Sequence, residues 1–572
     1  MIEMTRPRFL NYDPAPLAFG TSGLRGLVKD ITDLEAYINA RGFLAYLLKA
    51  GDVAPGGSVA LGGDLRPSTD RIMAAVARAV ADTDLRVENA GKISTPALAY
   101  WAMQRGWPSI MVTGSHIPFD RNGIKFNKSA GEVLKADEAG ILAEVSDVRR
   151  GEYAKSANET PFEDSGMLKK GRRPELPPPE EEARRMYVRR YLDVFPHGSL
   201  MGRRLLVYEH SAVGRDILGE ILKALGAEVV AVGRSETFIP IDTENVTAEQ
   251  LDRLDAMAKE ALKGGRLDAV LTMDGDSDRP LVAGVVGPEE ADAQGRLVRF
   301  YGGDLLGALV AEYLRADGAA VPISANDAVD GHLKSLGVRL VKTKIGSPYV
   351  IAAMQELKKT GWYSRVVSWE ANGGFLTGTD MEVDGKVLKA LPTRDALLPI
   401  LCALHSAFGR SLSVAQNFAR LPRRYSRAGL LDNFPPEASR AILARFSPSD
   451  ETTREVLFSG EEVSVLDAHG TMRKLGASAP LAKEELSKKA EIETFFTLVR
   501  GFNAVQRINV IDGVRIFFEG GDIAHIRPSG NAPQLRIYAC GSSQERADGI
   551  AQACLSEPDG ILRRIEKALK AR

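Results

Sequence analysis

Short apolar runs, each followed by a polar loop with glycine and then by a helical pattern, recur along the chain. The first four runs are residues 58–61, 110–112, 205–208 and 267–273. Such runs are typical of buried strands, and their alternation with helices predicts βα units on parallel sheets. Runs at residues 321–324 and 365–368 continue the pattern. We therefore expect several α/β modules in series, with ligands bound at the loops that follow the strands.

Changes of composition along the chain predict where these modules end. Residues 171–180 contain four prolines and favour an extended linker. Beyond about Leu421, charged helical segments give way to strand-like runs at 514–518 and 535–538, which predicts a final α+β domain. The predicted domains are residues 1–180, 181–302, 303–421 and 422–572.

Length and charge narrow the class of protein. A chain of 572 residues is too long for one hydrophobic core, and 74 basic residues nearly cancel 75 acidic ones. No overall field attracts nucleic acid or an anionic membrane, so neither is expected as a partner. The N-terminal residues have no apolar segment of signal-peptide length, and no stretch approaches eighteen apolar residues, which predicts a cytoplasmic protein. Three cysteines without metal-ligand spacing are typical of reduced thiols.

Ser115 lies just past the second apolar run, between Gly114 and the stiffening Pro118. A hydroxyl in such a loop can be presented rigidly to a ligand. The plain alternative is a turn serine that only caps the backbone, beside a loop-anchoring His116 and a solvated surface Lys125.

The acidic loop Asp274-Gly275-Asp276-Ser277-Asp278-Arg279 follows the fourth run. Three carboxylates at alternate positions suit Mg²⁺, which prefers oxygen ligands. A calcium-binding loop is excluded, because such a loop needs glycine at its sixth position and glutamate at its twelfth. Counted from Asp274, this chain has Arg279 and Val285 there. A solvated acidic turn without a metal is the other alternative.

Two further loops carry groups suited to a sugar phosphate. Glu370 and Asn372 can hydrogen-bond vicinal hydroxyls, and Arg527, with Arg536 in the run beyond it, can form a phosphate cradle. Three neighbours of Arg527 complete that cradle: Ser529, Gly530 and Asn531.

The order and spacing of these loops, together with the segment from Phe19 to Gly26, resemble the α-D-phosphohexomutase superfamily over nearly the whole chain. The resemblance implies three similar α/β domains with mixed or parallel sheets and a smaller C-terminal α+β domain around a central cleft. It implies that Ser115 is a phosphoserine, that an oxygen of this group and the three aspartates hold Mg²⁺, and that Glu370 and Asn372 bind the sugar. The Arg527 loop then holds the phosphate that does not react. The groups implied around the transferring phosphoryl are Arg25, His116, Lys125 and Arg279.

The implied activity is an intramolecular phosphotransferase, an isomerase of carbohydrate metabolism that interconverts hexose 1-phosphate and 6-phosphate. A hexose 1,6-bisphosphate is both intermediate and activator, and the enzyme is a monomer or homodimer. The Thr-Gly-Ser-His sequence at Ser115 favours mannose or glucose, as in phosphomannomutases and phosphoglucomutases. The sequence from Glu370 to Gly373 favours the phosphoglucosamine or N-acetylglucosamine-phosphate mutases instead. A sugar phosphatase with a serine nucleophile, or a non-catalytic sugar-phosphate sensor, are alternatives of other classes.

Three positions depart from the superfamily pattern. Gly374 stands where many members have histidine, Trp369 where many have glycine, and Ser347 where some have histidine. The general acid and base are therefore left open between Lys125 and His116.

Overall fold

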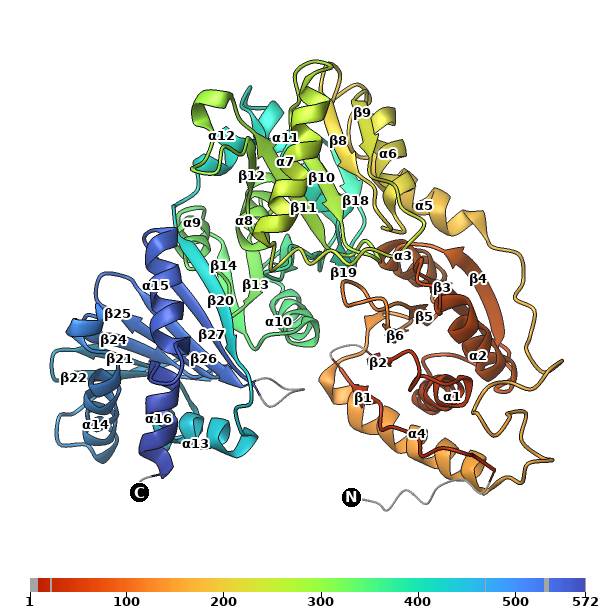
Figure 1. The fold of residues 1–572 in the computed structure, drawn as a ribbon, viewed down its shortest axis with the longest axis horizontal. Helices are drawn as coiled ribbons and strands as arrows, with labels where there is room; N and C mark the ends of the chain where they lie inside the picture. The colour runs from red at the N-terminus through yellow and green to blue at the C-terminus, as the bar shows by residue number, and fades with distance from the viewer. Residues whose placement is uncertain (1–8, 21–22, 469, 529–533, 571–572) are drawn as a thin grey trace. The chain divides into compact units, whose positions relative to one another are not determined.

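The computed structural model describes residues 9–20, 23–468, 470–528 and 534–570 (Figure 1). The chain divides into two compact units. The first unit comprises Met1–Val321, Leu333–Val341 and Gly346–Arg420. The second comprises Pro322–His332, Lys342–Ile345 and Leu421–Arg572.

The first sheet is mixed and carries the serine loop. Its order is β1-β2-β6-β5-β3-β4, with β7 paired to β6; β3 runs parallel to β4 and β5, and β6 runs antiparallel to β5. The strands are β1 (Ala18–Phe19), β2 (Gly23–Leu27), β3 (Ser58–Gly63), β4 (Arg86–Lys92), β5 (Ser109–Val112), β6 (Arg121–Lys128) and β7 (Gly131–Glu132). The helices of this region are α1 (Asp33–Ala50), α2 (Thr69–Ala81), α3 (Thr95–Arg105) and α4 (Lys135–Ala154).

Helix α1 shows how local sequence sets these bounds. The Thr32 hydroxyl accepts a hydrogen bond from the Glu35 N–H at its start, and Gly51 ends it in a left-handed conformation with φ of 71°. Its buried side chains, among them Leu34, Phe43 and Leu47, join the core of this region.

The second sheet carries the acidic loop. Its order is β12-β11-β10-β8-β9, with β10, β8 and β9 parallel and β11 antiparallel to β10. The strands are β8 (Arg204–Tyr208), β9 (Glu228–Val232), β10 (Ala269–Met273), β11 (Pro280–Val285) and β12 (Val298–Phe300). The helices are α5 (Glu181–Leu192), α6 (Arg215–Ala224), α7 (Ala248–Leu262) and the 3-10 turn η1 (Pro288–Glu290).

The third sheet carries the sugar-loop candidates Glu370 and Asn372. Its order is β14-β13-β15-β16-β19, and β17 and β18 form a separate hairpin. The strands are β13 (Gly318–Pro322), β14 (Arg339–Thr343), β15 (Val366–Trp369), β16 (Phe375–Thr377), β17 (Met381–Val383), β18 (Lys386–Leu388) and β19 (Leu391–Asp395). The helices are α8 (Gly303–Tyr313), α9 (Ala328–Ser335), α10 (Ser347–Lys359), α11 (Leu397–Phe408) and α12 (Val414–Ala419).

The C-terminal sheet is antiparallel, with the order β20-β27-β26-β25-β24-β21-β22-β23. The strands are β20 (Tyr425–Leu431), β21 (Thr453–Ser459), β22 (Glu462–Asp467), β23 (Met472–Leu475), β24 (Val505–Asn509), β25 (Val514–Phe518), β26 (Ile523–Pro528) and β27 (Leu535–Gly541). The helices are α13 (Pro436–Phe446), α14 (Pro480–Phe495), the 3-10 turn η2 (Leu498–Arg500), α15 (Gln544–Leu555) and α16 (Ile561–Lys570).

The predicted class of an α/β protein with several mixed sheets is confirmed. One detail differs from expectation. The described C-terminal sheet has eight strands, and β20 to β23 precede α14, where only helical segments were predicted. Strands such as β23, which is mostly exposed and has two charged side chains among its four residues, lack the apolar signal of a buried strand. The domain boundaries stay predictions.

No helix of the described residues is long and apolar enough to cross a membrane.

Candidate functional site

The serine loop begins where β5 ends. Ser115 is buried and adopts a left-handed conformation with φ of 55°, which non-glycine residues seldom do. Its N–H donates to the Thr113 hydroxyl at 2.8 Å, and its Oγ donates to Asp274 Oδ2 at 2.6 Å. A strained backbone thus aims the Ser115 hydroxyl at the acidic loop.

Arg66, which sequence reasoning missed, holds this loop in place. Its guanidinium is fully buried and donates to the Ser115 carbonyl at 2.9 Å. It also donates to three more carbonyls of the loop, those of Ile117, Pro118 and Arg121. Asp64 pairs with Arg66 Nε at 3.2 Å and accepts from the Thr113 hydroxyl at 2.8 Å. Arg66 and Asp64 lie in the loop after β3, which repeats the pattern of an apolar strand followed by a polar loop. This pattern was the only sequence signal that could have pointed to them.

The acidic loop joins β10 to β11 and packs directly on the serine loop. A Cβ added at Gly275 would lie 2.6 Å from the Ser115 carbonyl oxygen, so only glycine permits this approach. Asp274, Asp276 and Asp278 are fully buried, and one oxygen from each lies within 4.8 Å of the others. The three carboxylates converge as the sequence predicted for a metal site.

These oxygens fit a cation. Asp276 Oδ1 and Asp278 Oδ1 are buried without any hydrogen-bond partner in the described part of the chain. Burial and the charges of Asp276 and Asp278 raise the pKa of Asp274 well above its usual range. A cation bound between the three would relieve this repulsion and satisfy the unpaired oxygens, so the residues present can hold a metal ion.

Lys125 on β6 neutralises the outer side of the acidic loop. Its Nζ donates to Asp276 Oδ2 and to Asp278 Oδ2, each at 2.6 Å. Burial opposes its charge, yet Asp276 and Asp278 outweigh that effect and raise the pKa of Lys125. Thr95, at the start of α3, donates to the same Asp276 oxygen at 2.5 Å. Lys125 is therefore a buried cation rather than a solvated surface lysine.

Two arginines add positive charge near the acidic loop. Arg279 Nε lies 3.6 Å from Asp278 Oδ1 and 3.9 Å from Asp274 Oδ2. Loss of solvent and then the charge of Arg279 lower the pKa of Arg25 to about 10, although part of the Arg25 side chain remains exposed. Crowded cations of this kind favour an anionic ligand.

His116 lies beside the Ser115 hydroxyl, with its Nδ1 3.3 Å from Ser115 Oγ. Burial, followed by the positive charge of Arg279, lowers the pKa of His116 to about 3. The imidazole is therefore neutral in this arrangement, and its Nδ1 lies within hydrogen-bonding distance of Ser115 Oγ.

The sugar loop follows β15. Glu370 is buried and accepts from Arg394 Nη1 at 3.0 Å, while Asn372 Oδ1 accepts from the Gly374 N–H at 3.0 Å. Thr243 donates to the Asn372 carbonyl at 2.7 Å, which joins the segment before α7 to this loop. The structure thus brings Glu370 to the acidic loop through Arg394, a second residue that sequence reasoning missed.

Comparison with known proteins gives one consistent result. Family models for the phosphoglucomutase/phosphomannomutase alpha/beta/alpha domain I, alpha/beta/alpha domain III and C-terminal domain match residues 16–151, 302–425 and 479–556. A phosphomannomutase of Sinorhizobium fredii is 37% identical over 540 residues, covering 93% of this chain and 96% of the relative. One from Salmonella muenchen is 35% identical, covering 94% and 95%.

The chain belongs to the phosphoglucomutase/phosphomannomutase family. It is therefore a member of the α-D-phosphohexomutase superfamily and a hexose phosphate mutase, an isomerase. The crystal structure of a putative phosphomannomutase from Thermus thermophilus shares the fold, with a TM-score of 0.61 at 18% identity, covering 98% of this chain and 100% of that one.

Two departures from the superfamily pattern have structural explanations in this phosphohexomutase. Trp369 is fully buried and stacks on Phe375 with ring centroids 5.9 Å apart, so it belongs to the core. Ser347 begins α10 and donates to the buried Glu132 at 2.8 Å, so it joins α10 to β7 of the first sheet. Neither position offers an acid or base to the site.

Arg527 lies in the second unit of the phosphohexomutase, at the end of β26. Its Nε pairs with Asp512 Oδ2 at 3.1 Å. Its register partner on the neighbouring strand β27 is Arg536. Ser529, Gly530 and Asn531 lie outside the described residues. The Arg527 guanidinium is partly exposed and anchored at its base.

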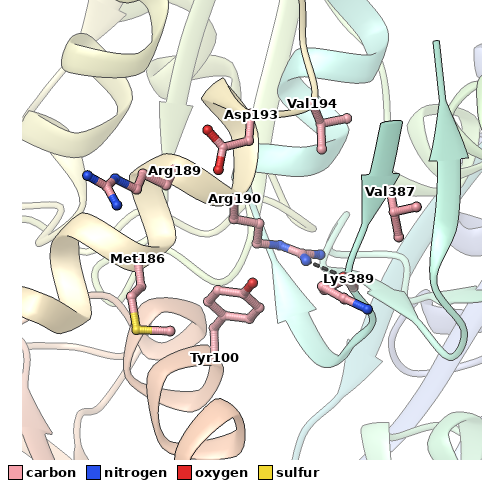
Figure 2. A pocket seen from close by; sticks show the side chains of 8 residues that line it. All are labelled: Tyr100, Met186, Arg189, Arg190, Asp193, Val194, Val387 and Lys389. Atoms are coloured by element: carbon pink, nitrogen blue, oxygen red, sulfur yellow. Dashed lines mark hydrogen bonds between the residues drawn. The ribbon is translucent and has the colours of Figure 1, made fainter. Parts of the chain in front are cut away.

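A separate cavity of about 240 Å³ is lined by residues of α3, of α5 and the turn after it, and of β18 and the position that follows it (Figure 2). Arg190 crosses its wall over the Tyr100 ring, 5.1 Å from the ring centroid, and donates to the Lys389 carbonyl. None of the predicted site residues lines this cavity.

Proposed function

We propose that this phosphohexomutase interconverts mannose 1-phosphate and mannose 6-phosphate through a phosphoserine at Ser115 and a hexose 1,6-bisphosphate. The observation that carries this proposal is the placement of Ser115 Oγ, 2.6 Å from Asp274, which belongs to a group of three aspartates with two oxygens that lack a hydrogen-bond partner in the described residues. The preference for mannose is supported by two phosphomannomutases that are 35% and 37% identical over nearly the whole chain.

We assign Mg²⁺ to Asp274, Asp276 and Asp278, because hard oxygen donors with room for a phosphate oxygen suit this ion. When bound, the ion would offset the negative charge of the phosphoryl group.

Residues of the chain carry out the proton transfers and bind the phosphoryl group. In the forward half, the bond from phosphorus to Ser115 Oγ breaks as a bond to the sugar hydroxyl oxygen forms. His116, beside Ser115 Oγ, takes the proton that the sugar hydroxyl loses and passes it to Ser115 Oγ as that oxygen leaves phosphorus. Lys125 donates both of its contacts to carboxylates, so its role is to hold Asp276 and Asp278 rather than to take a proton. Arg25 and Arg279 stabilise the equatorial oxygens.

The second half reverses these roles after the bisphosphate turns end for end. Ser115 Oγ then receives the other phosphoryl group and gives up its proton, which His116 passes to the sugar oxygen as the bond from that oxygen to phosphorus breaks. Glu370 and Asn372 hold the hydroxyls, and Arg527 with Ser529, Gly530 and Asn531 holds whichever phosphate is not reacting. The residue types support these roles, since a carboxylate and an amide accept from hydroxyls and a guanidinium binds phosphate in a fork.

The sequence from Glu370 to Gly373 favours an amino-sugar mutase as the second candidate. The test is an assay panel with the 1-phosphates of mannose, glucose, glucosamine and N-acetylglucosamine, each with Mg²⁺ and a bisphosphate activator. We expect the highest kcat/KM with mannose 1-phosphate and little release of free phosphate. Preference for an amino sugar would replace the substrate assignment, and phosphate release that matches turnover would indicate a phosphatase.

A further inference from the structure

Arg394 on β19 connects two loops that come from different sheets. Its side chain is buried, with 6% of its surface exposed. Its Nε donates to Asp278 Oδ2 and its Nη1 donates to Glu370 Oε2, each at 3.0 Å. One guanidinium therefore fixes a carboxylate of the acidic loop and a carboxylate of the sugar loop at the same time.

Gly374 provides the space that this arginine occupies. A Cβ added at Gly374 would lie 2.7 Å from Arg394 Cδ, 2.8 Å from Cγ and 3.0 Å from Cβ. These atoms form the base of the side chain, where it cannot swing aside as its far end could. Any larger residue at position 374 must therefore displace Arg394.

Glu370 is left with one oxygen for a ligand. Arg394 engages Oε2, and no residue of the described chain donates to Oε1. Pairing with a guanidinium limits the rotation of the Glu370 carboxylate. A carboxylate oxygen held in a fixed direction is a strong acceptor for a sugar hydroxyl.

We propose that Arg394 is a positioning residue that aims Glu370 Oε1 at a hydroxyl of the hexose phosphate. This role rests on the proposed function, because it assumes that Glu370 binds the sugar. The acidic loop depends on Arg394 less, since Asp278 Oδ2 also accepts from Lys125 at 2.6 Å. Loss of Arg394 should therefore weaken sugar binding more than metal binding.

The experiment compares Arg394→Gln with Arg190→Gln, a control that removes another buried arginine, one that lies over Tyr100 and bonds to the Lys389 carbonyl (Figure 2). Calorimetry measures the affinity for mannose 6-phosphate, and electron paramagnetic resonance measures the affinity for Mn²⁺ without sugar. We expect Arg394→Gln to weaken sugar phosphate binding by about tenfold or more, the cost of losing a charge-assisted hydrogen bond. Mn²⁺ affinity should change by less than about threefold, the smaller effect expected where a second cation still holds Asp278. Arg190→Gln should alter only thermal stability.

Two further variants separate positioning from general damage. Gly374→Ala leaves every charge in place but displaces Arg394, so it should reproduce the weaker sugar binding even if Arg394→Gln folds poorly. In a Glu370→Gln background, Arg394→Gln should cause little further loss, because both changes remove the same contact.

Equal loss of Mn²⁺ and sugar affinity in Arg394→Gln, or unchanged sugar binding in a folded Gly374→Ala, would overturn the proposal. Both affinities are measured without turnover, so the result is independent of whether the mannose assay succeeds. Failure of that assay would count against the proposed function alone.

Discussion

Replacing Arg66 with methionine should release the serine loop from its left-handed conformation. A left-handed serine costs about 1–3 kcal/mol, and Ser115 keeps this conformation with φ of 55° because the surrounding contacts oppose relaxation. Arg66 supplies four of these contacts through carbonyls of the loop and pairs with the buried Asp64.

The magnitude follows from burial. Breaking a buried ion pair by removing one partner costs about 3–5 kcal/mol, because Asp64 is left as an uncompensated charge. Of the four carbonyl contacts only that of Ser115 is fully buried, so the other carbonyls can regain water and add less. The free energy lost with the Arg66 contacts thus exceeds the free energy of the left-handed conformation of Ser115. The loop conformation that presents the Ser115 hydroxyl to Asp274 becomes a minor state. We expect turnover of the folded variant to fall roughly tenfold to a hundredfold.

The assay pairs turnover, corrected for the folded fraction, with hydrogen exchange across residues 113–122. Faster exchange should be confined to this loop. Arg71→Met is the matched control, because Arg71 likewise joins an aspartate, Asp33, to the backbone carbonyls of Val28 and Ile31. That variant should lose stability but keep its turnover. If Arg66→Met exchanges like the wild type at the loop and retains turnover within about threefold, Arg66 does not hold Ser115 and the reasoning is wrong.

Two other changes test the metal site and the phosphate cradle. Asp276→Asn should weaken Mn²⁺ binding by about tenfold or more, because it removes one of three anionic ligands; calorimetry on the free enzyme checks this, and unchanged affinity would contradict the assignment. Arg527→Ala should raise KM for the 1-phosphate and 6-phosphate by similar factors, with about 1.5–3 kcal/mol lost in each direction. Free bisphosphate should then accumulate during turnover. Kinetics in both directions with chromatography of the products measure both effects, and a one-sided effect without leakage would oppose this role.

The sequence predicted those parts of the site whose residues are adjacent in the chain. Asp274, Asp276 and Asp278 occupy alternate positions in one loop after an apolar strand. Their spacing and their place after the strand were enough to predict that the three carboxylates converge. The apolar runs likewise located β3, β5, β8 and β10, because buried strands need continuous apolar residues.

Residues that act across long separations could not be predicted in this way. Arg66 lies 49 positions before Ser115, and Arg394 lies 116 positions after Asp278. A lone arginine in a loop or strand has no periodic signature, and only the folded chain shows which carbonyls and carboxylates it contacts. The burial of Lys125 was hidden for the same reason, since its partners Asp276 and Asp278 come from another sheet.

The central claim is that Ser115 carries the phosphoryl group between the two sugar positions. Intact-mass analysis of the enzyme after incubation with mannose 1,6-bisphosphate tests it most directly, with peptide mapping to locate the added mass. We predict one phosphate, located on Ser115, that is still present after turnover with mannose 1-phosphate and is absent from Ser115→Ala, whose turnover falls by orders of magnitude. A wild-type enzyme that turns over without ever carrying this phosphate, or a Ser115→Ala variant with wild-type turnover, would contradict the account.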